Sequence, residues 1–216
     1  MRDWWRDALA GGVPPTAGRR RGVVLRQALI LLTGMRIDEA LEALADDVEG
    51  HWLLIRESKT HQPRILYLSR QALGIVHALH AASRQRCLFE VGDGTSKYLA
   101  AWNHTQSFWH QLVRECKGAG THDPGEKRHQ SLRRMMSTWL YKRDPVAESA
   151  QLGHGSGVVM KHYLDVIRRL PKILDKYRLP DLDVEGFSWP QPIDAGLQRP
   201  DRLYAEFRKL VSRRRR

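Results

Sequence analysis

The chain has 216 residues, 42% of them hydrophobic, which is enough to bury the core of one ordinary domain. Its 36 Lys and Arg residues against 24 Asp and Glu give a formal net charge of +12, which favours a polyanionic partner, first of all DNA or RNA, over an acidic one. The longest apolar run, Ala28–Leu32, is far too short to cross a membrane, and nothing resembles a signal peptide, so a cytoplasmic protein without a membrane partner is expected.

The first predicted helix begins near Val24. Residues 1–22 contain Gly11-Gly12 and Pro14-Pro15 and are expected to be irregular. The helix is indicated by apolar residues at steps of three and four: Val24, Ala28, Leu31, Leu32 and Met35. Thr33-Gly34 interrupts this pattern, and Thr33 is expected to be the N-cap of a second helix. The apolar stripe of that second helix is Ile37, Ala40, Leu41 and Leu44.

The middle of the chain predicts a small antiparallel sheet. Residues 52–57 and 64–68 are typical of strands, and the segment 58–63 between them is typical of a hairpin turn. Residues 71–82 and 105–116 have helical periodicity, whereas 90–97 and 117–127 contain Gly or Pro and are expected to be loops.

The last part of the chain is again helical. Ser131 is expected to cap a helix reaching about Arg143, with an apolar face made of Leu132, Met135, Met136, Trp139 and Leu140. Asp144 and Pro145 begin another helix that Gly153 ends, and a further helix spans about 158–170. Residues 203–216 suggest a short basic helix. The predicted class is mainly α with a small antiparallel β-sheet, divided into an irregular segment 1–22, a core domain 23–170 and a basic C-terminal tail 171–216.

Arg36 and Arg133 are both predicted in the first turn of a helix, where the positive end of the helix dipole disfavours a cation. Positive groups that converge at one spot suit an anion such as phosphate. The alternative for Arg36 is a surface ion pair with Asp38, Glu39 or another acid.

Lys59, His154 and Tyr163 each have an ordinary explanation when taken alone. Lys59 lies in the predicted turn, where a lysine is usually solvated, although it can also bind phosphate or donate a proton. His154 follows a helix stop and is a candidate to face a cleft. Tyr163 lies on the apolar face of its helix, as core tyrosines do. The two cysteines and ten histidines show no zinc-ligand spacing, so neither a metal nor a cofactor is expected.

The order and spacing of these residues resemble the tyrosine recombinase (phage integrase) family over about residues 24–167. Its T-G-x-R-x-x-E segment is matched by Thr33, Gly34, Arg36 and Glu39. Its hairpin lysine, in a K-T-x-x-x-R context, is matched by Lys59, Thr60 and Arg64. The last two residues of its H-x-L-R segment are matched by Leu132 and Arg133. Its L-G-H segment is matched by Leu152-Gly153-His154, and the tyrosine that follows nine residues after that histidine is matched by Tyr163.

One position departs from the family pattern. The histidine three residues before the second arginine is replaced by Gln130, with His129 next to it and Arg134 where the family often has another histidine. Glutamine cannot accept a proton as histidine does. Three hypotheses follow: His129 takes the role through a small loop shift, Gln130 donates a hydrogen bond to the phosphate, or activity is weakened or lost.

The resemblance implies the catalytic-domain fold of the family and a strand transfer that needs neither metal nor ATP. Arg36 and Arg133 would hold the phosphate, His154 would add a hydrogen bond, Tyr163 would form a 3′-phosphotyrosine link, and Lys59 would protonate the 5′-oxygen that leaves. Expected DNA contacts are Arg64, Arg134, Arg213, Arg214, Arg215 and Arg216.

The expected partners are double-stranded DNA and further copies of the chain, as a tetramer on DNA at the nucleoid. Only about 23 residues precede the first core helix, so the N-terminal DNA-clamping domain common in the family is expected to be missing from this sequence. The sequence is then either a truncated piece, the product of a fragment gene, or a minimal recombinase that relies on other DNA contacts. The alternatives are a weakened family member that binds DNA or regulates, and a topoisomerase of type IB.

Overall fold

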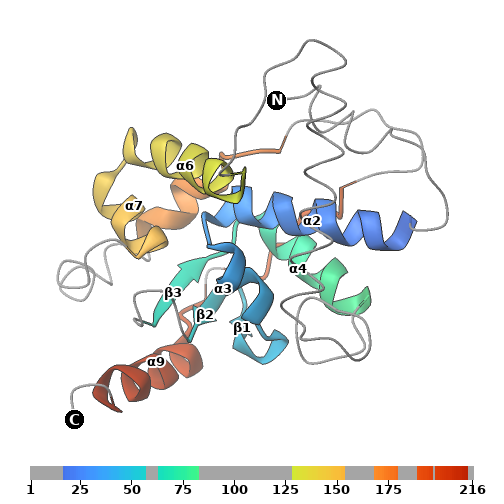
Figure 1. Ribbon diagram of the computed structural model, residues 1–216. Helices are drawn as coiled ribbons and strands as arrows, with labels where there is room; N and C mark the ends of the chain where they lie inside the picture. Colours follow the sequence, from blue (N-terminus) through green and yellow to red (C-terminus); the bar gives the residue numbers. More distant parts are fainter. Residues whose placement is uncertain are drawn as a thin grey trace.

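The computed structural model describes residues 17–56, 63–82, 128–153, 168–179, 189–196 and 198–213. Its helices are α2 (Ala17–Thr33), α3 (Ile37–Glu42), α4 (Arg70–Ala82), α6 (Arg128–Tyr141), α7 (Pro145–Leu152) and α9 (Asp201–Arg213), with a 3-10 turn at Ala45–Asp47. Its strands are β1 (Val48–Glu49), β2 (Trp52–Ile55) and β3 (Arg64–Tyr67). The predicted class, mainly α with a small antiparallel sheet, is confirmed for the described residues (Figure 1).

Helix α2 lies at the centre of the structure, between α6 on one side and α4 with the sheet on the other (Figure 1). Every residue from Val24 to Met35 is buried, including the polar Arg26 and Gln27. The predicted stripe of Val24, Ala28, Leu31, Leu32 and Met35 is therefore confirmed, but it is only part of the buried surface. A helix buried on all sides carries the core of the domain rather than one amphipathic face.

The sheet has the order β1-β2-β3 and is antiparallel throughout. The two strands predicted from the sequence are confirmed as β2 and β3, and β1 was not predicted. Successive residues point to opposite faces. Leu53, Ile55, Leu66 and Leu68 join the core around α2 and α4, whereas Trp52, Leu54, Ile65 and Tyr67 join a second core with α6, α7 and α9. Both faces of this small sheet are thus covered.

Cross-strand register decides where the side chain of Arg64 lies. Ile55 is the partner of Arg64 across the β2–β3 ladder, and directly opposed residues share a face of the sheet. Because Ile55 packs in the core around α2, Arg64, the first residue of β3, is also on that face, and its guanidinium contacts Glu39 of α3.

The described part of the segment after residue 170 packs on the rest of the domain. Leu174, Leu203 and Phe207 are buried in the second core. The indole Nε1 of Trp52 donates to the carbonyl of Gln198 at 3.1 Å. The predicted basic helix is confirmed at Asp201–Arg213. Of the helix predicted over 158–170, only residues 168–170 lie within the described residues; these are helical, and the helical residues run on past Pro171 to residue 174.

Two predicted helix starts were wrong. Thr33 is the last residue of α2, and its hydroxyl donates to the carbonyl of Leu29 at 2.6 Å instead of capping the next helix. Helix α6 begins at Arg128, so Ser131 lies inside it. Asp144 is confirmed as the N-cap of α7, because its carboxylate accepts from the amides of Val146 and Ala147, both at 3.0 Å.

The helix predicted at 105–116, the loops at 90–97 and 117–127 and most of the hairpin turn lie outside the described residues. Within the ranges that the structure describes, no helix combines the length and the apolar character needed to span a lipid bilayer.

Candidate active site

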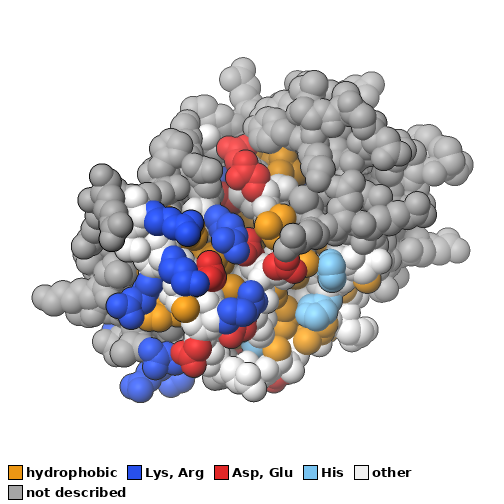
Figure 2. All heavy atoms as spheres, turned by 90° about the horizontal axis from the view of Figure 1, so that it is seen from below, with side chains coloured by type: hydrophobic (Ala, Val, Ile, Leu, Met, Phe, Trp, Pro, Cys, Tyr) orange, Lys and Arg blue, Asp and Glu red, His pale blue; other side chains and the backbone are white. Residues whose placement is uncertain are grey.

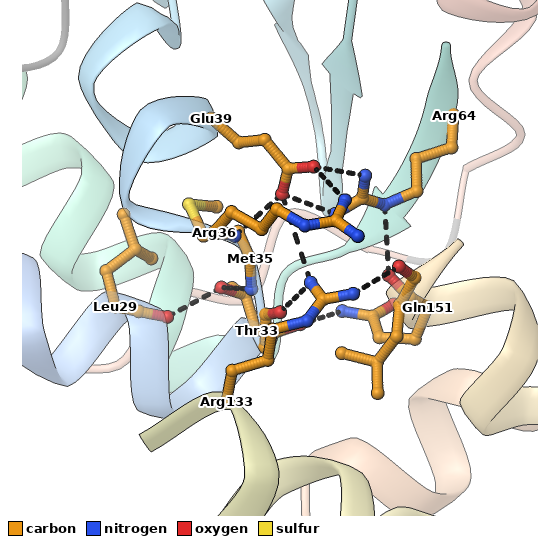
Figure 3. Close-up of polar contacts among 10 residues, drawn as sticks. Leu29, Thr33, Met35, Arg36, Glu39, Arg64, Arg133 and Gln151 are labelled. Atoms are coloured by element: carbon orange, nitrogen blue, oxygen red, sulfur yellow. Dashed lines mark hydrogen bonds and ion pairs between the residues drawn. The ribbon is translucent and has the colours of Figure 1, made fainter. Parts of the chain in front are cut away.

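Arg36 and Arg133 meet around one buried carboxylate, that of Glu39 (Figure 3). Arg36 is the N-cap residue of α3, and its Nη1 lies 3.2 Å from Glu39 Oε1. Arg133 comes from α6, and its Nη1 lies 4.0 Å from Glu39 Oε2. The side chains of Arg36 and Arg133 are 25% and 12% exposed, so both keep some access to solvent. The fold therefore brings the two predicted phosphate-binding arginines together.

Arg133 reaches this place from the second turn of α6, so its predicted position in the first turn was wrong. Its Nη1 donates to the carbonyl of Gly34, and its Nη2 donates to the carbonyl of Leu152 at 2.7 Å. These carbonyls lie at the C-terminal ends of α2 and α7. A helix ends in carbonyls without intrahelical partners and carries partial negative charge there, which stabilises a cation. The sequence had predicted Arg133 beside the positive end of a helix, which disfavours a cation. In the structure its guanidinium lies instead at the negative ends of two helices, which stabilise it.

A glycine in the left-handed conformation ends each of these two helices. Gly34 has φ +71° and Gly153 has φ +73°, values that other residues adopt only at a cost. Each glycine also allows a close approach: a Cβ at Gly34 would overlap Leu152 Cδ2, and one at Gly153 would lie 2.9 Å from Arg64 Cδ. The glycines of the T-G and L-G-H segments therefore shape the carbonyl cradle of Arg133.

Glu39 is held mainly by Arg64. Arg64 Nη1 and Nη2 donate to Glu39 Oε1 and Oε2, both at 2.6 Å, and Arg64 Nε donates to the carbonyl of Gln151 at 3.3 Å. The side chain of Arg64 is 7% exposed. Arg64 was expected to contact DNA, but its guanidinium faces Glu39 and its side chain is buried, so a DNA contact of Arg64 is not proposed.

The charge of this cluster is positive. Three guanidiniums, those of Arg36, Arg64 and Arg133, surround the carboxylate of Glu39, and the charge of Glu148 also acts on Arg133, so three cations face two carboxylates. Burial would raise the pKa of Glu39, but the hydrogen bonds and charge of Arg64, the amide of Arg36 and the charge of Arg133 lower it below its ordinary value of 4.5. Burial, with the charge of Arg64, lowers the pKa of Arg133 to about 10, so it remains a cation at neutral pH. An incoming phosphodiester would offset this excess of positive charge.

Gln151 is a structural residue of the site that the sequence analysis missed. Its side chain is fully buried; it accepts from the amide of Tyr67 at 2.9 Å and donates to the carbonyls of Thr33 and Tyr67 at 3.1 and 3.0 Å. It thereby ties α7 to α2 and β3. Its signal in the sequence is a polar residue four positions after the buried Ala147, on the apolar face of a short helix.

Gln130 and Arg134 are exposed on α6, and Arg213 is exposed at the end of α9. Gln130 precedes Arg133 by three residues, so the two share a face of α6. In Figure 2 the Lys and Arg side chains gather on the side of the molecule where α9 lies in Figure 1; the exposed basic residues of α9 are Arg202, Arg208, Lys209 and Arg213. Lys59, His154, Tyr163, Arg214–Arg216 and the side chain of His129 lie outside the described residues.

The chain matches a known protein family in sequence. The model of the phage integrase family matches residues 19–168. No curated protein matches the chain. Among solved structures it is similar to the XerH site-specific recombinase bound to difH substrate in a pre-cleavage complex, with 22% identity and a TM-score of 0.49 over 75% of this chain and 47% of that one. A post-cleavage complex of XerH with palindromic difH gives 24% identity and a TM-score of 0.49 over 78% and 49%. The chain thus spans about half the length of these recombinases.

Proposed function

This chain belongs to the phage integrase family, and on that premise we propose that it is a site-specific DNA recombinase acting through a 3′-phosphotyrosine intermediate on Tyr163. The observation that carries the proposal is the convergence of Arg36 and Arg133. The two residues come from different helices and meet in a positively charged, partly exposed cluster around Glu39. Such a cluster suits a phosphodiester, because each guanidinium can hold two phosphate oxygens.

In the proposed reaction the phenolic oxygen of Tyr163 attacks phosphorus, and the bond to the 5′-oxygen breaks. Negative charge grows on the non-bridging oxygens, where Arg36 and Arg133 provide positive charge and His154 a hydrogen bond. Lys59 gives a proton to the departing 5′-oxygen. The covalent link conserves the energy of the broken bond, so a new 5′-hydroxyl can reseal the strand without ATP.

A second candidate is a family member that binds DNA but cleaves it slowly. Gln130 favours it, because this residue occupies the helical position that the family gives to a histidine and shares a face of α6 with Arg133. Since α6 already includes residues 128–130, a loop shift that moves His129 into the role would have to unwind the start of this helix. General-base catalysis is typically worth about 10²- to 10⁴-fold, so a glutamine there would slow cleavage without abolishing it.

A suicide DNA duplex, nicked so that the cleaved strand diffuses away, tests both candidates. The wild-type chain is expected to form a covalent adduct on its own recombination site, and Tyr163→Phe is expected to form none. Gln130→His should then raise the rate of adduct formation, whereas His129→Ala should leave it unchanged. A wild-type chain that binds the site and forms the adduct slowly, at a rate that Gln130→His raises by about 10²- to 10⁴-fold, would support the second candidate. A wild-type chain that binds the site and forms no adduct would rule out the recombinase.

The proposed DNA partner is double-stranded, and the residues proposed to contact its phosphates are Arg134, Arg213 and Arg214–Arg216. We further propose that four copies of the chain act on two duplexes at the nucleoid. Each phosphate contact releases counterions, so replacing Arg134 should reduce the slope of log affinity against log salt by about one. The mass of the complex on DNA, measured by light scattering, tests the tetramer.

A further inference from the structure

The carboxylate of Glu39 has four short contacts. Arg64 provides two of them at 2.6 Å, the amide of Arg36 provides one at 2.7 Å, and Arg36 Nη1 provides the fourth at 3.2 Å. A carboxylate has about four lone-pair sites for hydrogen bonds. Glu39 is therefore saturated, and Arg64 occupies half of its capacity.

Arg133 lies at the edge of this arrangement. Its Nη1 is 4.0 Å from Glu39 Oε2, beyond hydrogen-bond distance, and its guanidinium instead donates to the carbonyls of Gly34 and Leu152. A buried carboxylate with open sites attracts the nearest cation strongly, because the surroundings have a low dielectric constant. Without Arg64, the nearest such cations among the described residues are Arg36 and Arg133.

We propose that Arg64 is a positioning residue: by saturating Glu39 it prevents that carboxylate from capturing Arg133, and so keeps Arg133 in its carbonyl cradle and directed toward the scissile phosphate. This inference rests on the proposed function for its link to DNA cleavage. It assigns Arg64 no contact with DNA, in agreement with the burial of its side chain. It also makes the ladder of β2 and β3, which sets the position of Arg64, part of the assembly of the site.

A purely structural role for Arg64 predicts a different pattern of variants. If Arg64 only stabilised the core, Arg64→Met would lower the free energy of unfolding, and the molecules that stay folded would form the adduct at the wild-type rate. If Arg64 restrains Glu39, folded Arg64→Met is slow, and neutralising Glu39 restores part of the rate per folded molecule. The rates of Arg64→Met and of Arg64→Met/Glu39→Gln, each corrected for the folded fraction, therefore separate the two roles.

The test measures the rate of covalent adduct formation on the suicide duplex together with affinity for the same DNA. Arg64→Met is expected to slow adduct formation by about 100-fold, the size of effect that a small misplacement of a catalytic group produces, while DNA affinity stays unchanged. Adding Glu39→Gln should recover about tenfold of that loss. A double variant as slow as Arg64→Met, or slower, would overturn the proposal.

The matched control is Arg56, which follows β2 and forms a similar pair with Asp47. Its Nε lies 2.9 and 3.0 Å from the two carboxylate oxygens of Asp47, and its Nη2 lies 2.6 Å from Asp47 Oδ1. These hydrogen bonds and this ion pair involve neither Arg36 nor Arg133. Arg56→Met should leave the rate of adduct formation at the wild-type value. If a thermal unfolding scan shows that Arg64→Met is not folded, Arg64→Lys with and without Glu39→Gln gives the same comparison. A single ammonium cannot donate to both carboxylate oxygens of Glu39 in the way that the guanidinium does.

A second measurement does not depend on cleavage. The side-chain Nε–Hε NMR signal of Arg133 should shift in Arg64→Met and return toward its wild-type position in the double variant. An unchanged Arg133 signal in Arg64→Met would overturn the inference. If the wild-type chain gives no adduct, the proposed function fails, and the NMR comparison alone decides whether Arg64 restrains Glu39.

Discussion

Gly34 and Leu152 pack so closely that a single carbon added at Gly34 would overlap Leu152 Cδ2. Gly34 follows the last residue of α2, and Leu152 is the last residue of α7. The carbonyls of both residues accept hydrogen bonds from Arg133. The contact between the two helix ends therefore creates the cradle in which one catalytic candidate is held.

Gly34→Ala is expected to destabilise the protein by about 2 to 5 kcal/mol. About 1 to 2 of this comes from the left-handed conformation and about 1 to 3 from the overlap with Leu152. Chemical denaturation measures the loss. Gly50 is the matched control, because it also has a positive φ, +54°, but nothing lies within 4 Å of an added Cβ. Gly50→Ala should cost only the backbone part, and equal losses for the two variants would contradict this account.

Arg133→Lys is expected to slow adduct formation by about 10²- to 10³-fold, the usual effect of losing one donor to a developing oxyanion. A lysine keeps the charge but cannot span both the Gly34 and Leu152 carbonyls and still present a fork to phosphate. Arg134, the next residue, is exposed and serves as the comparison. Arg134→Lys should leave cleavage of bound DNA at the wild-type rate. A similar loss of rate in both variants would contradict a specific role for the Gly34 and Leu152 carbonyls in positioning Arg133.

Gln151→Met is expected to cost about 3 kcal/mol or more in unfolding free energy. It preserves the approximate volume but leaves the amide of Tyr67 and the carbonyls of Thr33 and Tyr67 without their side-chain partner, and each buried group left unsatisfied costs about 1 to 3 kcal/mol. Urea unfolding monitored by tryptophan fluorescence measures the change. Gln198→Met, at an exposed position, should be nearly neutral.

Glu39 is expected to make stability depend on acid pH. Its pKa is lower in the folded protein than its ordinary value of 4.5, so its contribution is fully present above that value and is lost as the pH falls through the lower folded value. Thermal midpoints recorded from about pH 7 down to about pH 3 should fall more steeply for the wild type than for Glu39→Gln. Glu206→Gln removes a surface carboxylate whose pKa is also lowered, by Lys209, and it should flatten the curve less than Glu39→Gln does, because solvent screens an exposed pair.

The local patterns of the sequence predicted much of the fold. Helix periodicity identified α2, α4, α6 and α9, two strand-like runs on either side of a turn segment identified β2 and β3, and Asp144 with Gly153 marked both ends of α7, because each of these signals acts within a few residues. Local patterns were less reliable at helix starts. Thr33 and Ser131 are both acceptable caps by residue type, yet each lies within a helix. For α2 the reason is burial, because every residue from Val24 to Met35 packs against neighbouring elements and the helix runs on to Thr33.

The sequence by itself determined which residues could form a phosphate site: the spacing of Arg36, Arg133, His154 and Tyr163 is a one-dimensional property, and family membership follows from it. Only the tertiary structure decided how Arg36 and Arg133 are held. The pairing of Arg64 with Glu39 spans 25 positions and depends on strand register, and the cradle of Arg133 depends on two helix ends that meet. Such contacts depend on packing between distant segments, which residue type and spacing along one chain do not specify.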